Sequence, residues 1–128
     1  MLRIILTIAA LVTMTIAADS QETIFSRMIK TPGAVDSLTQ EITVKTLAAH
    51  LCKIEETLPK ADIMVLMTAL ENADPEAAKH GKLVANLSLQ GLPIKMKPGT
   101  EQCRMVERSI KEAIPLYHTL ATAATDPR

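Results

Sequence analysis

The chain has 128 residues, with 14 Lys and Arg against 14 Asp and Glu, and 2% aromatic residues. A net charge of zero argues against a nucleic-acid-binding protein, which needs basic groups to replace phosphate counterions, and against attachment to an anionic membrane surface. With so few aromatic residues, the core has to consist of aliphatic residues and methionine, which suits helices better than a β-sandwich.

The first 18 residues, 1–18, have the layout of a secretory signal peptide. A basic start with Arg3 precedes an apolar run over residues 4–16, and two alanines ending at Ala18 follow it. A transmembrane anchor is the alternative, but the run is shorter than the roughly 20 residues that cross a bilayer. We expect cleavage near Ala18, a single helical domain over residues 19–128, and a periplasmic or secreted protein with no membrane attachment after cleavage.

Cys52 and Cys103 are the two cysteines of the sequence. In an exported chain such a pair is expected to form a disulfide, whereas two free buried thiols are the alternative that export disfavours. The closed loop of about 50 residues would stabilise the fold by roughly 4 kcal/mol in the chain-entropy model. The sequence therefore predicts a Cys52–Cys103 disulfide.

The mature chain begins with a short predicted helix over residues 20–30. Its apolar side chains have helical spacing, and Ser20 is the candidate N-cap. The Thr-Pro-Gly sequence at residues 31–33 ends it.

Residues 37–58 give the clearest helix pattern before the first loop. Ser37 and Gln40 match a capping box. Apolar residues then recur at alternating steps of three and four, which predicts one buried stripe. The stripe consists of Val44, Leu47, Leu51, Ile54 and Leu58.

A third helix is predicted over residues 63–72. Pro59 interrupts the preceding pattern, and Asp62 is the candidate N-cap. Because the segment is apolar almost all round, we expect it to be the central, most buried helix.

A fourth helix is predicted to start after Asp74, with Pro75 in the first turn, and to run to Gln90. The glycine and proline of residues 91–93 would end it. A hairpin over residues 82–97 is the alternative, since apolar residues alternate there as well. The clear helix start and the poor turn sequence favour the helix.

The last predicted helix follows a turn that ends in Thr100, its candidate N-cap. Pro115 lies within it, where the missing N–H predicts a kink or a break. One apolar stripe runs along the segment: Cys103, Val106, Ile110, Ala113, Tyr117, Leu120 and Ala124. The sequence thus predicts an all-α fold, a small bundle of four to five helices held by one disulfide.

No group of residues has the pattern of a catalytic or metal site. His50, His80 and His118 lack the ligand spacing of a metal centre, and we expect them to face solvent. Paired acids such as Glu55 and Glu56 lie among lysines and arginines, as on a solvated helix face. We therefore expect neither an enzyme nor a cofactor.

Two predicted helices carry the candidate apolar binding surface. Methionine suits both an irregular core and an adaptable binding surface, and the core is the favoured interpretation for most of the methionines. The candidate residues are Ile63, Met64, Leu66, Met67, Leu70, Val106, Ile110, Tyr117 and Leu120.

The layout resembles the small periplasmic acid-stress chaperones of the HdeA type. The matching features are Cys52 and Cys103, the apolar residues 65–72 and the acidic, proline-containing turn at residues 72–76. The resemblance covers residues 47–114. It implies an all-helical protein with one disulfide, idle at neutral pH, which loosens in acid and holds unfolded clients.

Two functions follow as expectations. The first is an HdeA-like chaperone for unfolded clients. The alternative is a protein that binds one specific partner, such as an immunity or inhibitor protein or a small subunit of an envelope assembly. Both require protein partners, and both allow a homodimer.

Overall fold

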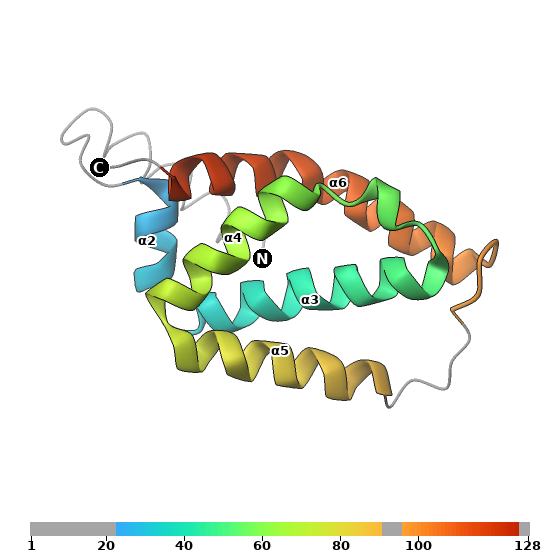
Figure 1. Ribbon diagram of the computed structural model, residues 1–128, viewed down its shortest axis with the longest axis horizontal. Coiled ribbons are helices and arrows are strands. Elements are labelled where there is room, and N and C mark those ends of the chain that lie inside the picture. The colour runs from blue at the N-terminus through green and yellow to red at the C-terminus, as the bar shows by residue number, and fades with distance from the viewer. Residues whose placement is uncertain (1–22, 91–95, 126–128) are drawn as a thin grey trace.

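The computed structural model describes residues 23–90 and 96–125, which form five α-helices and one 3₁₀ turn (Figure 1). These ranges contain no strand, and the cysteines are bonded, so the predicted all-α fold with one disulfide is confirmed. The predicted signal peptide, Ser20 and residues 91–93 lie outside the described residues. The elements are α2 (Ile24–Lys30), α3 (Ala34–Cys52), η1 (Glu55–Thr57), α4 (Lys60–Ala73), α5 (Pro75–Gln90) and α6 (Glu101–Ala124).

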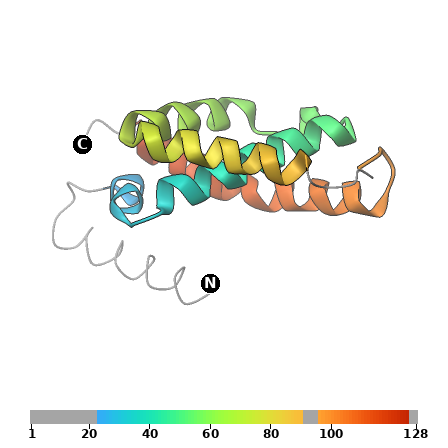
Figure 2. The ribbon, with the colours of Figure 1, turned by 90° about the horizontal axis from the view of Figure 1, so that it is seen from below.

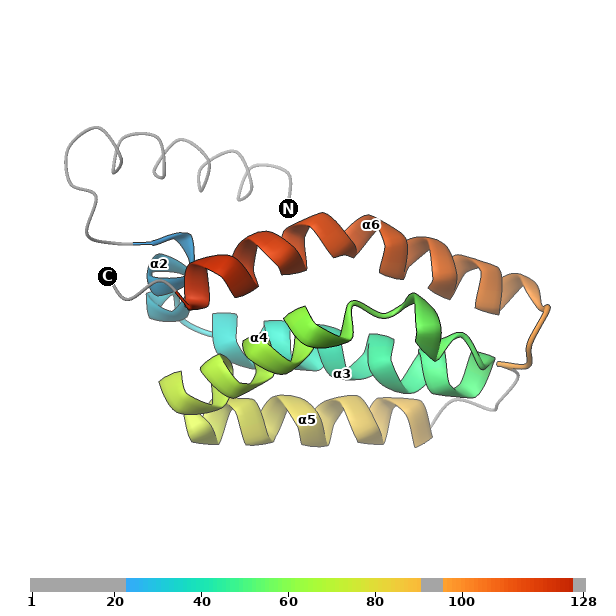
Figure 3. The same ribbon diagram turned by 45° about the horizontal axis from the view of Figure 1, so that its top comes forward.

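Helix α3 is the centre of the bundle and contacts each of the other described helices. Helix α5 runs alongside it, α4 packs against α5 and α6, and the long α6 lies on the other side (Figures 1 and 3). Helix α2 lies across the end of the bundle where α6 finishes, and Figure 2 shows it end-on. The main core gathers residues from α2, α3, α4, α5 and α6.

Helix α2 starts at Ile24, and the Thr23 side chain caps it by accepting a hydrogen bond from the Ser26 N–H at 3.0 Å. The N-cap is thus Thr23 rather than Ser20. The helix ends at Lys30, as the turn sequence predicts.

Helix α3 begins three residues earlier than predicted. Gly33 has a φ of 80°, in the left-handed region that glycine adopts without strain, so the chain turns there and the helix starts at once. Ser37 therefore lies inside the helix, and the predicted capping box is wrong. Gln40 instead donates a hydrogen bond from Nε2 to Oδ1 of Asp36 at 3.0 Å.

The predicted apolar stripe of α3 is also wrong. The helix ends at Cys52, so Ile54 and Leu58 fall beyond it, and Leu51 is 48% exposed. The helix has two partly apolar sides, and the neighbouring helices pack against the one that was not predicted. This buried side carries several small residues. The buried residues are Val35, Leu38, Thr39, Ile42, Ala48, Ala49 and Cys52.

Helix α4 is not the most buried helix. It begins at Lys60 after Pro59, so Asp62 lies in the first turn rather than at the N-cap. Leu66 and Leu70 are its buried residues, and much of the rest faces outward. The helix packs mainly against α6 and α5 and buries only one side, so its other apolar residues are partly exposed.

Helix α5 confirms the predicted start, since Asp74 accepts a hydrogen bond from the Ala77 N–H at 3.1 Å. It remains helical to Gln90, which rules out a strand over residues 82–90. It approaches α3 closely at Gly81, where an added Cβ would lie 2.7 Å from the Asp36 carbonyl oxygen. Small side chains at this contact let the two backbones come together.

Helix α6 confirms the predicted stripe: its buried residues include Cys103, Ile110, Tyr117 and Leu120. Pro115 lies inside it without breaking it. The proline is on the exposed side, where water can bind the carbonyl group that loses its partner. Figure 3 shows α6 as one continuous helix that is bowed in its middle.

Candidate functional site

The Cys52–Cys103 disulfide joins the last residue of α3 to the first turn of α6, with the Cα atoms 5.6 Å apart. Both cysteines are buried. The bond fixes α3 and α6 to each other at one end of the bundle. Any surface formed between these two helices is therefore held at that end by a covalent bond.

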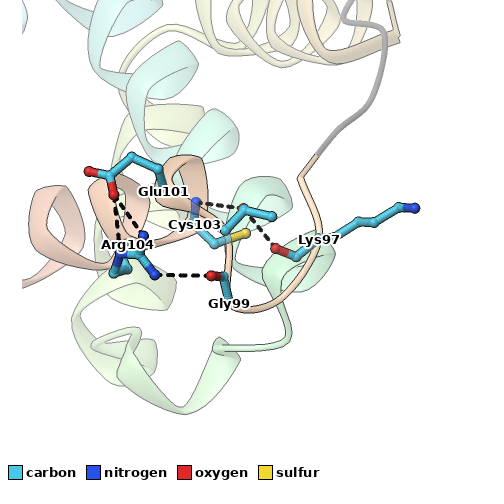
Figure 4. Close-up of polar contacts among 6 residues, drawn as sticks. Lys97, Gly99, Glu101, Cys103 and Arg104 are labelled. Carbon is cyan, nitrogen blue, oxygen red and sulfur yellow. Dashed lines mark hydrogen bonds and ion pairs between the residues drawn. The ribbon is translucent and has the colours of Figure 1, made fainter.

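Polar contacts hold the turn that precedes Cys103 (Figure 4). The Thr100 hydroxyl accepts a hydrogen bond from the Cys103 N–H at 3.3 Å and donates one to the Lys97 carbonyl at 2.8 Å. Arg104 donates to the Gly99 carbonyl at 3.0 Å and to the carboxylate three residues before it. These contacts confirm Thr100 as the N-cap and orient the cysteine toward α3.

The candidate apolar binding surface lies mostly inside the fold. Its residues on α4 and α6 face one another or the core, so the folded protein exposes little of this surface. Met64 is the clear exception, at 70% exposure. Of the others, Leu66, Leu70, Ile110, Tyr117 and Leu120 are buried, and Ile63, Met67 and Val106 are half-buried.

All three histidines are exposed, and each lies against a carboxylate. His118 on α6 is 3.2 Å from Oδ2 of Asp62 on α4. His80 on α5 is 2.7 Å from Oδ2 of Asp36 on α3. The third contact is local, between His50 at the end of α3 and Glu55 in η1, at 2.9 Å.

Sequence reasoning missed these partners. The His80 and His118 contacts join residues 44 and 56 positions apart, so no local spacing indicates them. His50 and Glu55 are five positions apart, and a helix end between them could have suggested the contact. The contacts place titratable groups at two interhelical junctions.

The acids in two of these contacts favour their ionised forms. The pKa of Asp36 is lowered, first by the hydrogen bond from Gln40 and then by His80, against the opposing effect of desolvation. The pKa of Glu55 is lowered chiefly by its hydrogen bond with His50, with a smaller effect from the Lys60 charge. Both carboxylates thus stabilise the fold in their ionised state.

A groove of about 530 Å³ runs between α3 and α6. Its charged groups are Glu41 and Lys45, which form an ion pair at 3.0 Å, and the Lys45 side chain is only 15% exposed. Nearby, burial and then the Glu41 charge raise the pKa of Tyr117. The lining residues are Ser37, Gln40, Glu41, Val44, Lys45, Ala48, Met96, Met105, Val106 and Ser109.

No family model matches this chain. Neither a curated protein nor a solved structure matches it. Within residues 23–90 and 96–125, no helix is long and apolar enough to cross a membrane. Over the same ranges, no three His, Cys, Asp or Glu side chains are grouped so that they could hold a metal ion. The features that remain for function are the covered apolar surface, the histidine contacts and the groove.

Proposed function

We propose that this protein is an exported helical binding protein of the HdeA type, which is idle at neutral pH and holds unfolded proteins in acid. One observation carries the proposal. The apolar surface between α4 and α6 is covered in the folded state, and the His118–Asp62 contact bridges the two helices at the solvent edge of that surface. A change of charge at this contact would therefore weaken the attachment of α4 to α6 beside the covered apolar surface.

Acid removes the charge on which such contacts depend. Below about pH 3 carboxylates are protonated, so an Asp–His ion pair no longer has its negative partner. After removal of the predicted signal peptide with Arg3, 13 Lys and Arg and the 3 His then carry positive charge without compensation, and their repulsion loosens the bundle. The disulfide keeps one end of α3 and α6 together, which limits how far the chain opens.

Aggregation of an unrelated client protein tests this function. The light scattering of the client would be followed between pH 7 and pH 2, with and without the disulfide-bonded protein. We expect suppression only in acid, together with increased binding of an apolar dye. Equal scattering with and without the protein at every pH would remove the proposal.

A charge variant connects the test to the α4–α6 contact. Asp62→Asn should shift the onset of dye binding toward higher pH, because the carboxylate that contacts His118 across the two helices is absent from the start. Glu76→Gln, an exposed acid in the first turn of α5, is the matched control. If both variants move the onset equally, the contact has no specific part in the opening.

A second function, binding of one specific partner at neutral pH, is favoured by the groove between α3 and α6. Unlike the α4–α6 surface, this groove is open in the folded state. A stoichiometric complex with one envelope protein at pH 7, without general protection of clients, would support this second function over the first.

A further inference from the structure

The groove between α3 and α6 lies on a side of α3 that the other described helices leave open. Four successive turns of α3 form one wall, from Ser37 to Ala48. Met105, Val106 and Ser109 of α6 form the other, and Met96, in the segment that precedes α6, also lines the groove. The apolar half of the lining consists of Val44, Ala48, Met96, Met105 and Val106.

Exposed apolar side chains continue this face in both directions. Leu51 follows Val44 by two turns of α3 and is 48% exposed, and Leu116 follows Ser109 by two turns of α6 and is 51% exposed. Met105, in the groove wall itself, is 59% exposed. Among the described residues, three of the six exposed large hydrophobic side chains thus belong to this one face.

The chemistry of the groove selects its occupant. An extended peptide needs partners for its backbone N–H and C=O groups, and the described part of the chain has no strand edge to supply them. A helix satisfies these groups internally and presents only side chains. The Glu41–Lys45 pair is already neutralised, so a complementary face carries aliphatic side chains without net charge.

We propose that this groove binds the aliphatic face of an amphipathic helix from a partner protein at neutral pH. From Ser37 to Leu51, at 1.5 Å per residue, the face is about 21 Å long, which matches a helix of about 14 residues. The flexible side chains of Met96 and Met105 adapt to different aliphatic side chains. The site belongs to the folded protein and does not depend on acid activation.

A labelled model helix tests the site. The probe is a peptide of about 14 residues, containing Leu, Ala and Gln, with leucines at positions i, i+4, i+7 and i+11 and one Lys–Asp side-chain lactam on the opposite face. Its fluorescence anisotropy would be measured at pH 7 against the disulfide-bonded protein. We expect saturable binding, and none by a peptide of the same composition in which the leucines are scattered around the helix.

Two variants locate the binding. Met105→Glu and Ser109→Arg alter exposed positions in the groove wall and should weaken binding about tenfold or more, with unchanged circular dichroism. Leu87→Glu is the matched control, since Leu87 is an exposed large apolar residue on α5, outside the groove and outside the α4–α6 surface. It should leave binding within about twofold.

Three results would overturn the proposal. They are no binding of the ordered peptide, equal binding of the scattered peptide, or equal loss in Met105→Glu and Leu87→Glu. Sedimentation of the protein alone provides a further check. A dimer that Met105→Glu dissociates would assign the groove to a second copy of this chain instead.

Discussion

Nδ1 of His118 lies 3.2 Å from Oδ2 of Asp62 at the solvent edge of the α4–α6 contact, although 56 positions separate the two residues in the chain. His80 and Asp36 form the equivalent contact between α5 and α3. Each contact pairs a group that acid charges with one that acid neutralises. Both contacts thus place an imidazole against a carboxylate at a junction between two helices.

Acid should destabilise the fold partly through Asp36. Its lowered pKa means that the carboxylate contributes stability above its unfolded pKa and loses it as the pH falls through the folded pKa. Asp36→Asn should be less stable than the wild type at pH 7 and should lose less stability between pH 7 and pH 3. Urea unfolding followed by circular dichroism at both pH values measures this difference.

Glu76→Gln supplies the comparison, because Glu76 is an exposed acid without a contact to a histidine in the structure. Its loss of stability in acid should parallel that of the wild type. Parallel curves for Asp36→Asn and the wild type would mean that the Asp36 contacts contribute nothing to the acid response.

Gly81→Ala should destabilise the protein by about 2 kcal/mol, within the range for overpacking a core contact. The added Cβ would lie 2.7 Å from the Asp36 carbonyl oxygen and 2.9 Å from Cβ of Thr39, so α5 has to move away from α3. Thermal unfolding at pH 7 measures the effect. Leu83→Ala, on the exposed side of the same helix, is the control and should change stability little. If Gly81→Ala is as stable as the wild type, α5 can move away from α3 without a loss of folding free energy.

Local signals predicted the second half of the fold well. Asp74 before Pro75 and Thr100 before the Cys103 stripe are capping residues, and a cap depends on a few adjacent residues. Helix α3 was predicted less well. Its start depends on the left-handed conformation of Gly33, and its buried side depends on which helices approach it. Neither is encoded in the spacing of its apolar residues.

The candidate site also has features that the sequence predicted and features that depend on how the helices pack. The predicted signal peptide and the pair of cysteines predicted the disulfide, whereas the histidine contacts depend on helix packing between distant segments. Val44 belonged to a stripe that was predicted to be buried, and the structure leaves it lining an open groove. An apolar stripe indicates a contact surface, but it cannot indicate whether the partner lies in the same chain.

Removal of the disulfide should cost about 4 kcal/mol in the chain-entropy model, given the sequence separation of 51 between its cysteines. Cys52→Ala/Cys103→Ala is the test variant, since alanine fits both buried positions without a clash. Urea unfolding at pH 7 compares it with the oxidised wild type. The reduced wild type is the control and should resemble the variant. A variant as stable as the oxidised protein would mean that packing alone holds α3 and α6 together.

Lys53→Gly should stabilise the protein by about 0.5 to 1 kcal/mol. Lys53 ends α3 with a φ of 58°, a left-handed conformation that costs energy for a residue with a Cβ but not for glycine. Its side chain is exposed, so its removal loses little packing. The same substitution at Lys79, an exposed residue within α5, should instead destabilise the protein by about 1 kcal/mol. Thermal unfolding measures both variants. If the backbone conformation determines the effect, the melting temperature rises for Lys53→Gly and falls for Lys79→Gly. If the loss of the lysine side chain determines it, both melting temperatures change in the same direction.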